Sequence, residues 1–381
     1  MLSESIIDKR LISASWWIVV FIAVEFFDYT FVNNAVLNVL NILLCDAIAF
    51  CVYYKYCNTS YERRQGSMLL SFIFVLWLFS IFAGMAHGGD SILRPYVLMM
   101  MLSNAFIAYT IIKKTLSVYP FKIAFYAISA YFLYLIIIKE VGVFEMFPRS
   151  GSGWAGSVVL SLSIIIQYIE LRNYGRVNLL TVLLAFVVCI MAYSRSSLVC
   201  GAVYFLVTLF FATRRFKNFF VRNIIFIVVF ALIAYQIINN WDAITTLDIY
   251  EKFNRKGLDN DGRQDIWSAY LGNMNFPNII LGIPIDTAHP LKGFTNPHNS
   301  LIQLHSQIGM FAFVFFYYIL KGGVRLMMKN IYLALLLIIL IVRGSTDIVF
   351  FFNYFDFVIY VLIFEQELKR RQVTDISLSI F

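Results

Sequence analysis

Five arginines occupy positions from which they could bind an anion: Arg94, Arg149, Arg195, Arg263 and Arg343. Each falls at one end of an apolar stretch or in the segment that follows one. Their side of the expected membrane is the one where polytopic proteins carry few Lys and Arg residues. A guanidinium donates paired hydrogen bonds to phosphate or carboxylate oxygens. Arginines kept on the disfavoured side therefore predict an anionic ligand.

The most constrained of these positions is Arg195, in residues 193–197 (YSRSS), where two apolar stretches meet with almost no loop. Ser194 or Ser196 is expected to cap the second helix. Backbone N–H groups, the helix dipole and a guanidinium would then converge, which suits a phosphate. The alternative is that Arg195 simply extends to lipid headgroups.

His298 is the candidate proton acceptor. Asn296 is expected to be a helix N-cap and Pro297 the first helical residue, which places His298 in the first turn. The positive helix end and nearby arginines disfavour an imidazolium, and a neutral imidazole can accept a proton. His305 lies seven residues further on, on the same face and about 10 Å deeper. A structural role for either histidine is the alternative.

Arg263 begins a helix within the long segment 240–297. The apolar residues of this helix fall on one stripe, which comprises Ile266, Trp267, Tyr270, Leu271 and Met274. Such a helix could lie on the bilayer surface or cover a cavity. Arg263 is then either a mobile ligand for the anion or a solvated loop residue. Arg343 also has an alternative, because Asp347 lies four residues on and could pair with it.

The composition places these residues in a membrane protein. The chain of 381 residues is 61% hydrophobic and 14% charged, with a mean hydropathy of +0.78. A soluble domain of this length would need more polar surface. The apolar stretches are about 18–22 residues long, the length of spanning helices and not of barrel strands. We therefore expect an all-α polytopic integral membrane protein.

Twelve spans are expected, at residues 11–30, 34–54, 67–86, 92–112, 119–138, 154–171, 176–193, 196–213, 222–239, 298–320, 328–345 and 346–365. Twenty of the 30 Lys and Arg residues then fall on the side of both termini, which the positive-inside rule makes cytoplasmic. The chain thus divides into nine spans (1–239), one large outer loop (240–297), three spans (298–365) and a cytoplasmic tail (366–381).

Several kinds of ligand are not expected. The net charge of +8 lies mostly in short loops on one side, as membrane insertion requires, and so does not indicate nucleic acid. The five cysteines show no CxxC spacing, and we expect free thiols with no metal. The sequence contains no P-loop, Rossmann glycine pattern, HExxH or GxSxG motif, and no cofactor is expected.

Polar residues inside the spans are costly and have two interpretations. Asn34, Asn38 and Asn41 share one face of the second span, and Asn353 and Asp356 share a face of the last. They could line a cavity or hydrogen-bond helices together. We favour the second interpretation.

The order of these features resembles the O-antigen polymerase and ligase superfamily, polytopic bacterial envelope enzymes with one large periplasmic loop late in the chain. The segment 194–197 (SRSS) is similar to the family's Ser-Arg-Gly/Ser turn. Residues 262–267 and 281–283 are similar to its loop pattern. His298-Asn299, nine residues and then Gly309 are similar to the ligase-type signature, although Ala312 departs from its last position. The likeness covers roughly 150–320.

This resemblance implies a metal-independent glycosyltransferase of the GT-C type in the bacterial inner membrane. It would use undecaprenyl-diphosphate-linked oligosaccharide repeat units at the periplasmic face, alongside membrane lipids, a chain-length regulator and a flippase as partners. His298, Arg195 and Arg263 would be catalytic. The substrate-binding residues would be Arg94, Arg149, Arg343, Asn299 and His305.

Three functions are compatible with these features. An O-antigen polymerase transfers the growing glycan onto a new lipid-linked repeat unit, and chain length and Ala312 favour it. An O-antigen ligase would transfer the glycan to lipid A-core instead. A flippase or other transporter is less favoured, because transporters place charges at mid-membrane and show internal repeats.

Overall fold

The structure is a computed structural model that describes residues 9–87, 95–139, 141, 153–192, 194–214, 235, 239, 263–285, 291 and 293–378. Within these ranges every regular element is a helix, and strand-like pairing is limited to an isolated bridge between Leu291 and Phe294. The predicted all-α class is confirmed for this part of the chain.

The helices follow the chain in this order: α1 (Lys9–Phe31), α2 (Ala35–Tyr56), α3 (Ser60–Ala86), α4 (Pro95–Lys113), α5 (Tyr119–Leu133), continued by the π-helix η2 (Tyr134–Ile138), α6 (Gly153–Tyr174), α7 (Leu179–Met191), α8 (Arg195–Thr213), α12 (Arg263–Gly272), α13 (Phe276–Leu281), α14 (Ser300–Ile308), α15 (Phe311–Lys329), α16 (Ile331–Ser345) and α17 (Phe357–Leu378).

Seven of the described helices are long and apolar enough to cross a membrane, namely α1, α2, α3, α5 with η2, α6, α8 and α15. Shorter apolar helices occur at residues 98–113, in α7 and in α16. The chain is therefore a multi-pass membrane protein. The predicted span 222–239 lies almost wholly outside the described residues, and a total of twelve spans stays a prediction.

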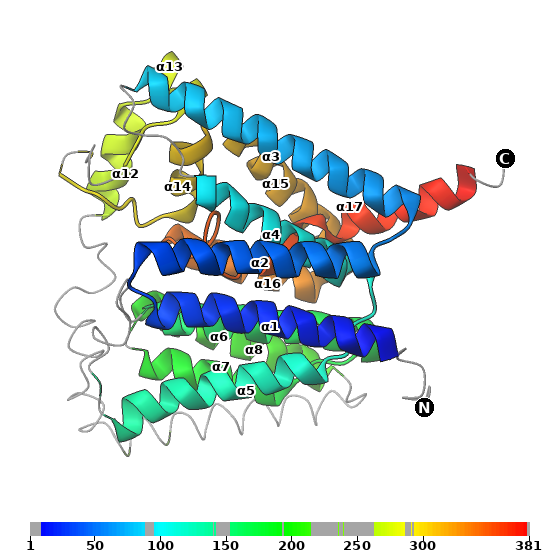
Figure 1. The fold of residues 1–381 in the computed structure, drawn as a ribbon. Coiled ribbons are helices and arrows are strands. Elements are labelled where there is room, and N and C mark those ends of the chain that lie inside the picture. Colours follow the sequence, from blue (N-terminus) through cyan, green and yellow to red (C-terminus); the bar gives the residue numbers. More distant parts are fainter. Residues whose placement is uncertain are drawn as a thin grey trace.

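The two ends of the bundle are built from different elements (Figure 1). The first residue of α1, the α2–α3 turn and the last turn of α17 lie at one end. The helices α12, α13 and α14 cluster at the other. The helices α12, α13 and α14 therefore build much of one end of the described part of the molecule.

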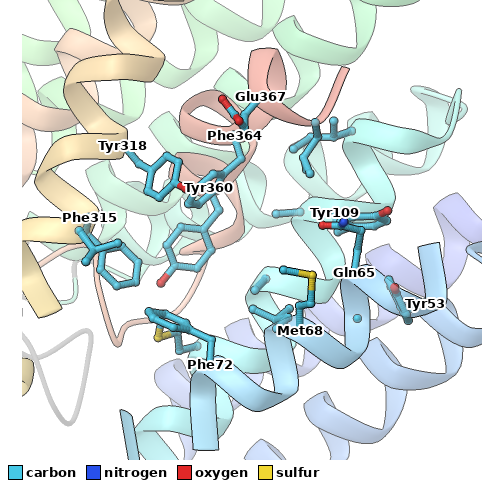
Figure 2. Close-up of a pocket in the computed structure, with 18 residues that line it drawn as sticks. Tyr53, Gln65, Met68, Phe72, Tyr109, Phe315, Tyr318, Tyr360, Phe364 and Glu367 are labelled. Carbon is cyan, nitrogen blue, oxygen red and sulfur yellow. The ribbon is translucent and has the colours of Figure 1, made fainter. Parts of the chain in front are cut away.

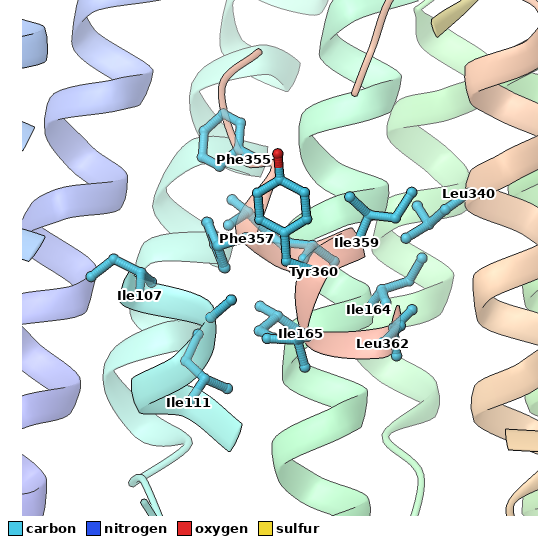
Figure 3. Close-up of a cluster of buried hydrophobic side chains, with 14 of the residues drawn as sticks. Ile107, Ile111, Ile164, Ile165, Leu340, Phe355, Phe357, Ile359, Tyr360 and Leu362 are labelled. Atoms are coloured by element: carbon cyan, nitrogen blue, oxygen red, sulfur yellow. The ribbon is translucent and has the colours of Figure 1, made fainter. Parts of the chain in front are cut away.

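Helix α6 forms the centre of the bundle. Of its most apolar stretch, 94% is buried, against 28–44% for the other long spans. Ile164 and Ile165 of α6 meet Ile107 of α4, Leu340 of α16 and Ile359 of α17 in the apolar core (Figure 3). Burying these side chains from all sides fixes α17 between α4, α6 and α16.

Helix α3 is less enclosed. It packs against α4 and α14. A cavity of about 330 Å³ separates its first half from α15 and α17 (Figure 2).

The predicted span 298–320 is wrong, because two helices occupy this segment. Helix α14 ends at Gly309, whose backbone is left-handed (φ 48°), and α15 begins at Phe311. The Met310 amide donates to the carbonyl of Ile280 (2.9 Å). The break therefore places the end of α14 in contact with α13.

The predicted last span, 346–365, is also wrong, since residues 346–356 are irregular and α17 starts at Phe357. The Asp356 carboxylate accepts from the Phe351 amide (2.9 Å) and the Asn353 amide (3.0 Å). These bonds replace helical ones. The backbone of Phe351, Phe352 and Phe355 is left-handed. Apolar composition alone could not distinguish this buried loop from a helix.

The three asparagines predicted on one face of the second span, Asn34, Asn38 and Asn41, have two structural roles. Asn34 caps α2 by accepting from the amides of Val36 (2.9 Å) and Leu37 (3.2 Å). Asn38 donates to Asp28 of α1 and to Tyr354 (2.9 Å), and Asn41 donates to the other oxygen of Asp28 (2.8 Å). The helix-bonding interpretation is confirmed for Asn38 and Asn41.

A second buried polar network joins α1, α4 and the start of α17. Glu25 of α1 accepts from Asn104 of α4 (2.8 Å) and from the Phe355 amide (3.0 Å). Asn104 in turn accepts from the Phe357 amide (2.9 Å). These bonds satisfy backbone groups that α17 leaves open at its buried start.

Candidate active site

Four helix ends meet at the end of the bundle that carries α12–α14. They are the starts of α6, α8 and α14 and the end of α16. The space at the start of α6 is narrow: a Cβ on Gly153 would lie 2.8 Å from Nη2 of Arg343, 3.2 Å from Oγ of Ser194 and 3.4 Å from Oδ2 of Asp347. Three polar side chains thus surround one glycine.

Arg343 is the buried centre of this cluster, with 1% of its surface exposed. Its Nη2 donates to the Gly153 carbonyl (3.0 Å) and lies 3.4 Å from Oδ2 of Asp347. Its Nη1 lies 3.4 Å from Oγ1 of Thr346. Its Nε is buried and has no hydrogen-bond partner within the described residues. The alternative expected for Arg343, pairing with Asp347, is confirmed.

Asp347 joins Arg343 to His298. Its Oδ1 lies 3.7 Å from Nδ1 of His298, and the His298 side chain is 40% exposed. Burial alone would raise the pKa of Asp347, but the His298 imidazole and the Arg343 guanidinium outweigh it and lower this pKa to about 2. Asp347 is therefore a carboxylate that faces a partly open histidine on one side and a buried arginine on the other.

The backbone of His298 differs from the expectation. Asn299, and not Asn296, caps α14 by accepting from the amides of Leu301 (2.9 Å) and Ile302 (3.2 Å). His298 precedes the helix in a left-handed conformation (φ 46°), and its amide donates to Oδ1 of Asn296 (2.7 Å). The prediction that His298 lies in the first helical turn is wrong, because the second of two asparagines takes the cap position.

Ser300 fixes the segment that carries Asp347. Its Oγ donates to the Asp347 carbonyl (2.9 Å) and accepts from the amides of Val349 (2.9 Å) and Phe350 (3.1 Å). A Cβ on Gly344 would lie 3.3 Å from this hydroxyl. The sequence pattern indicated Asp347 only as a partner for Arg343 and did not indicate Ser300. Their positions relative to His298 depend on a contact between residues 47 positions apart.

Arg195 is the first residue of α8 and is half-buried. Ser194 holds the N-cap position, but its side chain makes no capping hydrogen bond, and its Oγ lies 3.4 Å from that of Ser196. Ser194 is therefore at the expected cap position, but the capping hydrogen bond expected from a serine side chain is absent. Helix α8 is held against α6 instead: a Cβ on Gly156 would lie 2.5 Å from Cβ of Ser197.

Arg263 is the first residue of α12, as predicted, and Trp267 of α12 contacts the segment that carries His298. The Trp267 Nε1 donates to the Pro297 carbonyl (3.1 Å), next to His298. The predicted stripe is correct for Ile266 and Tyr270, which are buried. Leu271 of the same stripe is 63% exposed, so it does not pack against the described part of the protein. This helix therefore packs on the protein through Ile266 and Tyr270.

His305 joins three helices. Its Nε2 lies 3.1 Å from the Ile279 carbonyl and its Nδ1 lies 2.6 Å from the Tyr270 hydroxyl. A carbonyl only accepts, so Nε2 carries the proton and Nδ1 accepts from Tyr270. Burial lowers the pKa of His305. Neither ring nitrogen is open to a substrate in this arrangement.

The remaining predicted site residues are placed as follows. Arg94 and Arg149 lie outside the described residues, as does the segment 240–262 of the predicted outer loop. Oδ1 of Asn299 is occupied by its capping bonds. Within the described part of the chain, no group of three or more His, Cys, Asp or Glu side chains could hold a metal ion.

Comparison with known families adds one match: residues 180–317 match the family model described as O-antigen ligase. This match supports the resemblance of the chain to the O-antigen polymerase and ligase superfamily. The matched region contains Arg195, Arg263 and His298, whereas Arg343 and Asp347 follow it. We find no match for the chain among curated proteins or solved structures.

The geometry explains the spacing of the signature at 298–309. Asn299 is the N-cap of α14, the nine residues 300–308 are the helix, and Gly309 is its C-cap. A Cβ on Gly309 would overlap the Ile280 carbonyl oxygen. Gly282 of the loop pattern, with φ 84°, approaches α14 as well, where a Cβ would lie 2.6 Å from the His305 carbonyl oxygen. The signature thus encodes a short capped helix seated on α13.

Proposed function

We propose that this protein is an O-antigen polymerase, a glycosyltransferase that transfers a growing undecaprenyl-diphosphate-linked glycan onto a new lipid-linked repeat unit. The observation that carries the proposal is the His298–Asp347–Arg343 arrangement beside the start of α8. It combines a partly open imidazole with fixed positive charge at one end of the bundle. The match of residues 180–317 supports the resemblance to the O-antigen polymerase and ligase superfamily.

In the proposed reaction, a hydroxyl of the acceptor sugar attacks C1 of the donor glycan. The new C1–O bond forms as the bond from C1 to the diphosphate oxygen breaks, and undecaprenyl diphosphate leaves with the bonding electron pair. The hydroxyl proton passes to Nε2 of His298. Asp347 positions His298 by favouring the proton at Nδ1, which leaves the Nε2 lone pair towards the acceptor.

The arginines stabilise the leaving group. Negative charge grows on the diphosphate as the C1–O bond breaks, and guanidinium groups placed in advance stabilise that charge. Arg195 at the start of α8 and Arg263 at the start of α12 take this role. Arg343 acts through Asp347, which it holds ionised. Arg94 and Arg149 are proposed as further ligands of the diphosphate.

The proposed location follows from the charge bias. The end of the bundle with α12–α14 is proposed to face the periplasm, and both chain termini the cytoplasm, of an inner-membrane protein. The loop 240–297 is proposed to cover the site. A flippase would deliver the lipid-linked units and a chain-length regulator would set the product length.

An O-antigen ligase is the second candidate, because the description of the matched family names that activity. The two differ in the acceptor: a ligase transfers the glycan to lipid A-core. Both use the same donor, and the same residues would serve either reaction.

Gene deletion followed by gel analysis of the lipopolysaccharide separates these candidates. Loss of a polymerase leaves core carrying a single repeat. Loss of a ligase leaves core alone, with polymer retained on undecaprenyl diphosphate. An unchanged ladder would contradict both. Complementation with Arg195→Ala at normal membrane levels should fail, and Arg195→Lys should restore little, because one ammonium cannot replace a bidentate guanidinium.

A further inference from the structure

The cavity between α3, α4, α15 and α17 lies away from the candidate active site and plays no part in the proposed reaction. Its volume of about 330 Å³ falls within the range of small-molecule sites, about 300–1,000 Å³. Its lining is mainly aliphatic and aromatic, with Phe72, Phe315, Tyr318 and Phe364 drawn around it (Figure 2). Such a lining fits a hydrocarbon chain.

The cavity opens between α3 and α15. Met68 of α3 and Val314 of α15 both line it and are 54% and 40% exposed. Exposed apolar side chains on two spanning helices face the hydrocarbon of the bilayer. A lipid chain could therefore enter sideways, without passing through water.

Three cations contact the two residues at the polar end of this cavity, Glu367 and Leu368. Lys321 lies 3.1 Å from Oε2 of Glu367, and Arg325 pairs with the same oxygen. Lys113 donates to the Leu368 carbonyl (2.8 Å). Glu367 and Leu368 both line the cavity. Two positive groups thus share one lining carboxylate, and a third lies at the carbonyl of the next residue, an excess of positive charge where the apolar lining ends.

We propose that this cavity binds an anionic phospholipid, with one acyl chain between α3 and α15 and the phosphate beside Lys113, Lys321 and Arg325. The positive charges of these three side chains favour an anionic lipid headgroup over a neutral one. Lys113 lies in the last turn of α4, and Lys321 and Arg325 lie in the second half of α15. Both helices run towards the end of the bundle that contains the α2–α3 turn and the last turn of α17 (Figure 1). A polyprenyl diphosphate whose diphosphate lay at the other end, beside α12–α14, would place only its uncharged hydrocarbon tail in this cavity.

Native mass spectrometry of the purified protein tests this site, with phosphatidylglycerol and phosphatidylethanolamine of identical acyl chains as probes. Phosphatidylglycerol should be retained about tenfold better, because basic side chains attract an anionic headgroup. The triple variant Lys321→Gln, Arg325→Gln, Glu367→Gln removes two of the cations without leaving their carboxylate partner behind. It should lose the preference for phosphatidylglycerol.

Two further variants separate the cavity from general surface charge. Val314→Trp should block the mouth from an exposed position and reduce retention of both lipids. Lys55→Gln removes a cation from the last turn of α2, at the same end of the bundle, and should change nothing. Equal retention of both lipids by the wild type, or unchanged retention in Val314→Trp, would overturn the proposal. The proposal would also be overturned if the wild type retained a bound polyprenyl lipid that was lost in Val314→Trp and kept in the other variants, because the cavity would then hold that lipid.

Discussion

At the scale of single residues, Asp347 connects the two side chains that the sequence pattern left separate. Arg343 and Asp347 are four residues apart, and their pairing could be predicted from helical spacing. The approach of His298 could not, because it depends on the left-handed backbone of His298 and on Ser300 binding the Asp347 carbonyl. Local patterns contain neither the long-range contact nor the positive φ.

Replacement of Asp347 by Asn should lower the rate of glycan transfer by about 10²-fold or more, the scale of general acid–base effects. The Asn side chain keeps an acceptor for Arg343 but no longer stabilises a proton on His298. Donor binding should change little, and Asp347→Glu should recover part of the rate. Equal losses in donor binding and in turnover would assign Asp347 a structural role only.

The lowered pKa of Asp347 has a consequence for stability. Its carboxyl titrates with a pKa of about 2 in the folded protein, below its ordinary value of 3.8. Its ionisation therefore stabilises the fold above about pH 4, and this contribution is lost as pH falls towards 2. Thermal unfolding in detergent should show a smaller drop between about pH 5 and about pH 3 in Asp347→Asn than in the wild type. An identical drop would contradict this role.

At the scale of elements, the competition between caps decides where α14 begins. Asn296 and Asn299 are both good N-cap residues, and local sequence offers no means to choose between them. The structure uses Asn299, so Asn299→Ala should cost about 1 kcal/mol of stability. Ser194→Ala at the start of α8 should cost less than about 0.5 kcal/mol, since its side chain makes no capping bond. Chemical or thermal unfolding of the two variants measures the difference, and equal costs would contradict the assignment.

The glycine at the end of α14 should be the least replaceable of the described loop glycines at this face. A side chain at Gly309 meets both a left-handed backbone and the Ile280 carbonyl, so Gly309→Ala should cost well over about 2 kcal/mol. Gly293 is the matched control: its φ is also positive (85°), but a Cβ there would have no neighbour within 4 Å among the described residues. Gly293→Ala should cost only about 1 kcal/mol. Similar unfolding temperatures for the two variants would contradict the close approach.

At the scale of the whole molecule, composition and hydropathy predicted the helical membrane class and most helix positions. They failed where apolar sequence is not a spanning helix, at the break at Gly309 and in residues 346–356. Each failure comes from one residue within an apolar segment: Gly309, whose left-handed backbone ends α14, and Asp356, whose carboxylate accepts from the amides of Phe351 and Asn353. Hydropathy averages over such residues and cannot detect them.

The orientation of the bundle is testable by cysteine labelling. In a variant without the native cysteines, Leu271→Cys on α12 and Asn58→Cys between α2 and α3 place thiols at opposite ends. A membrane-impermeant thiol reagent applied to spheroplasts should label position 271 and leave position 58 unlabelled. The reverse pattern would put the candidate site in the cytoplasm and exclude transfer at the periplasmic face.

The proposed chemistry is tested by polymerisation with the purified protein in liposomes supplied with undecaprenyl-diphosphate-linked repeat units. We expect long glycans from the wild type. His298→Ala should bind the donor normally but form product at least about 10²-fold more slowly. Long glycans made by His298→Ala at the wild-type rate would show that His298 does not accept the proton of the attacking sugar hydroxyl.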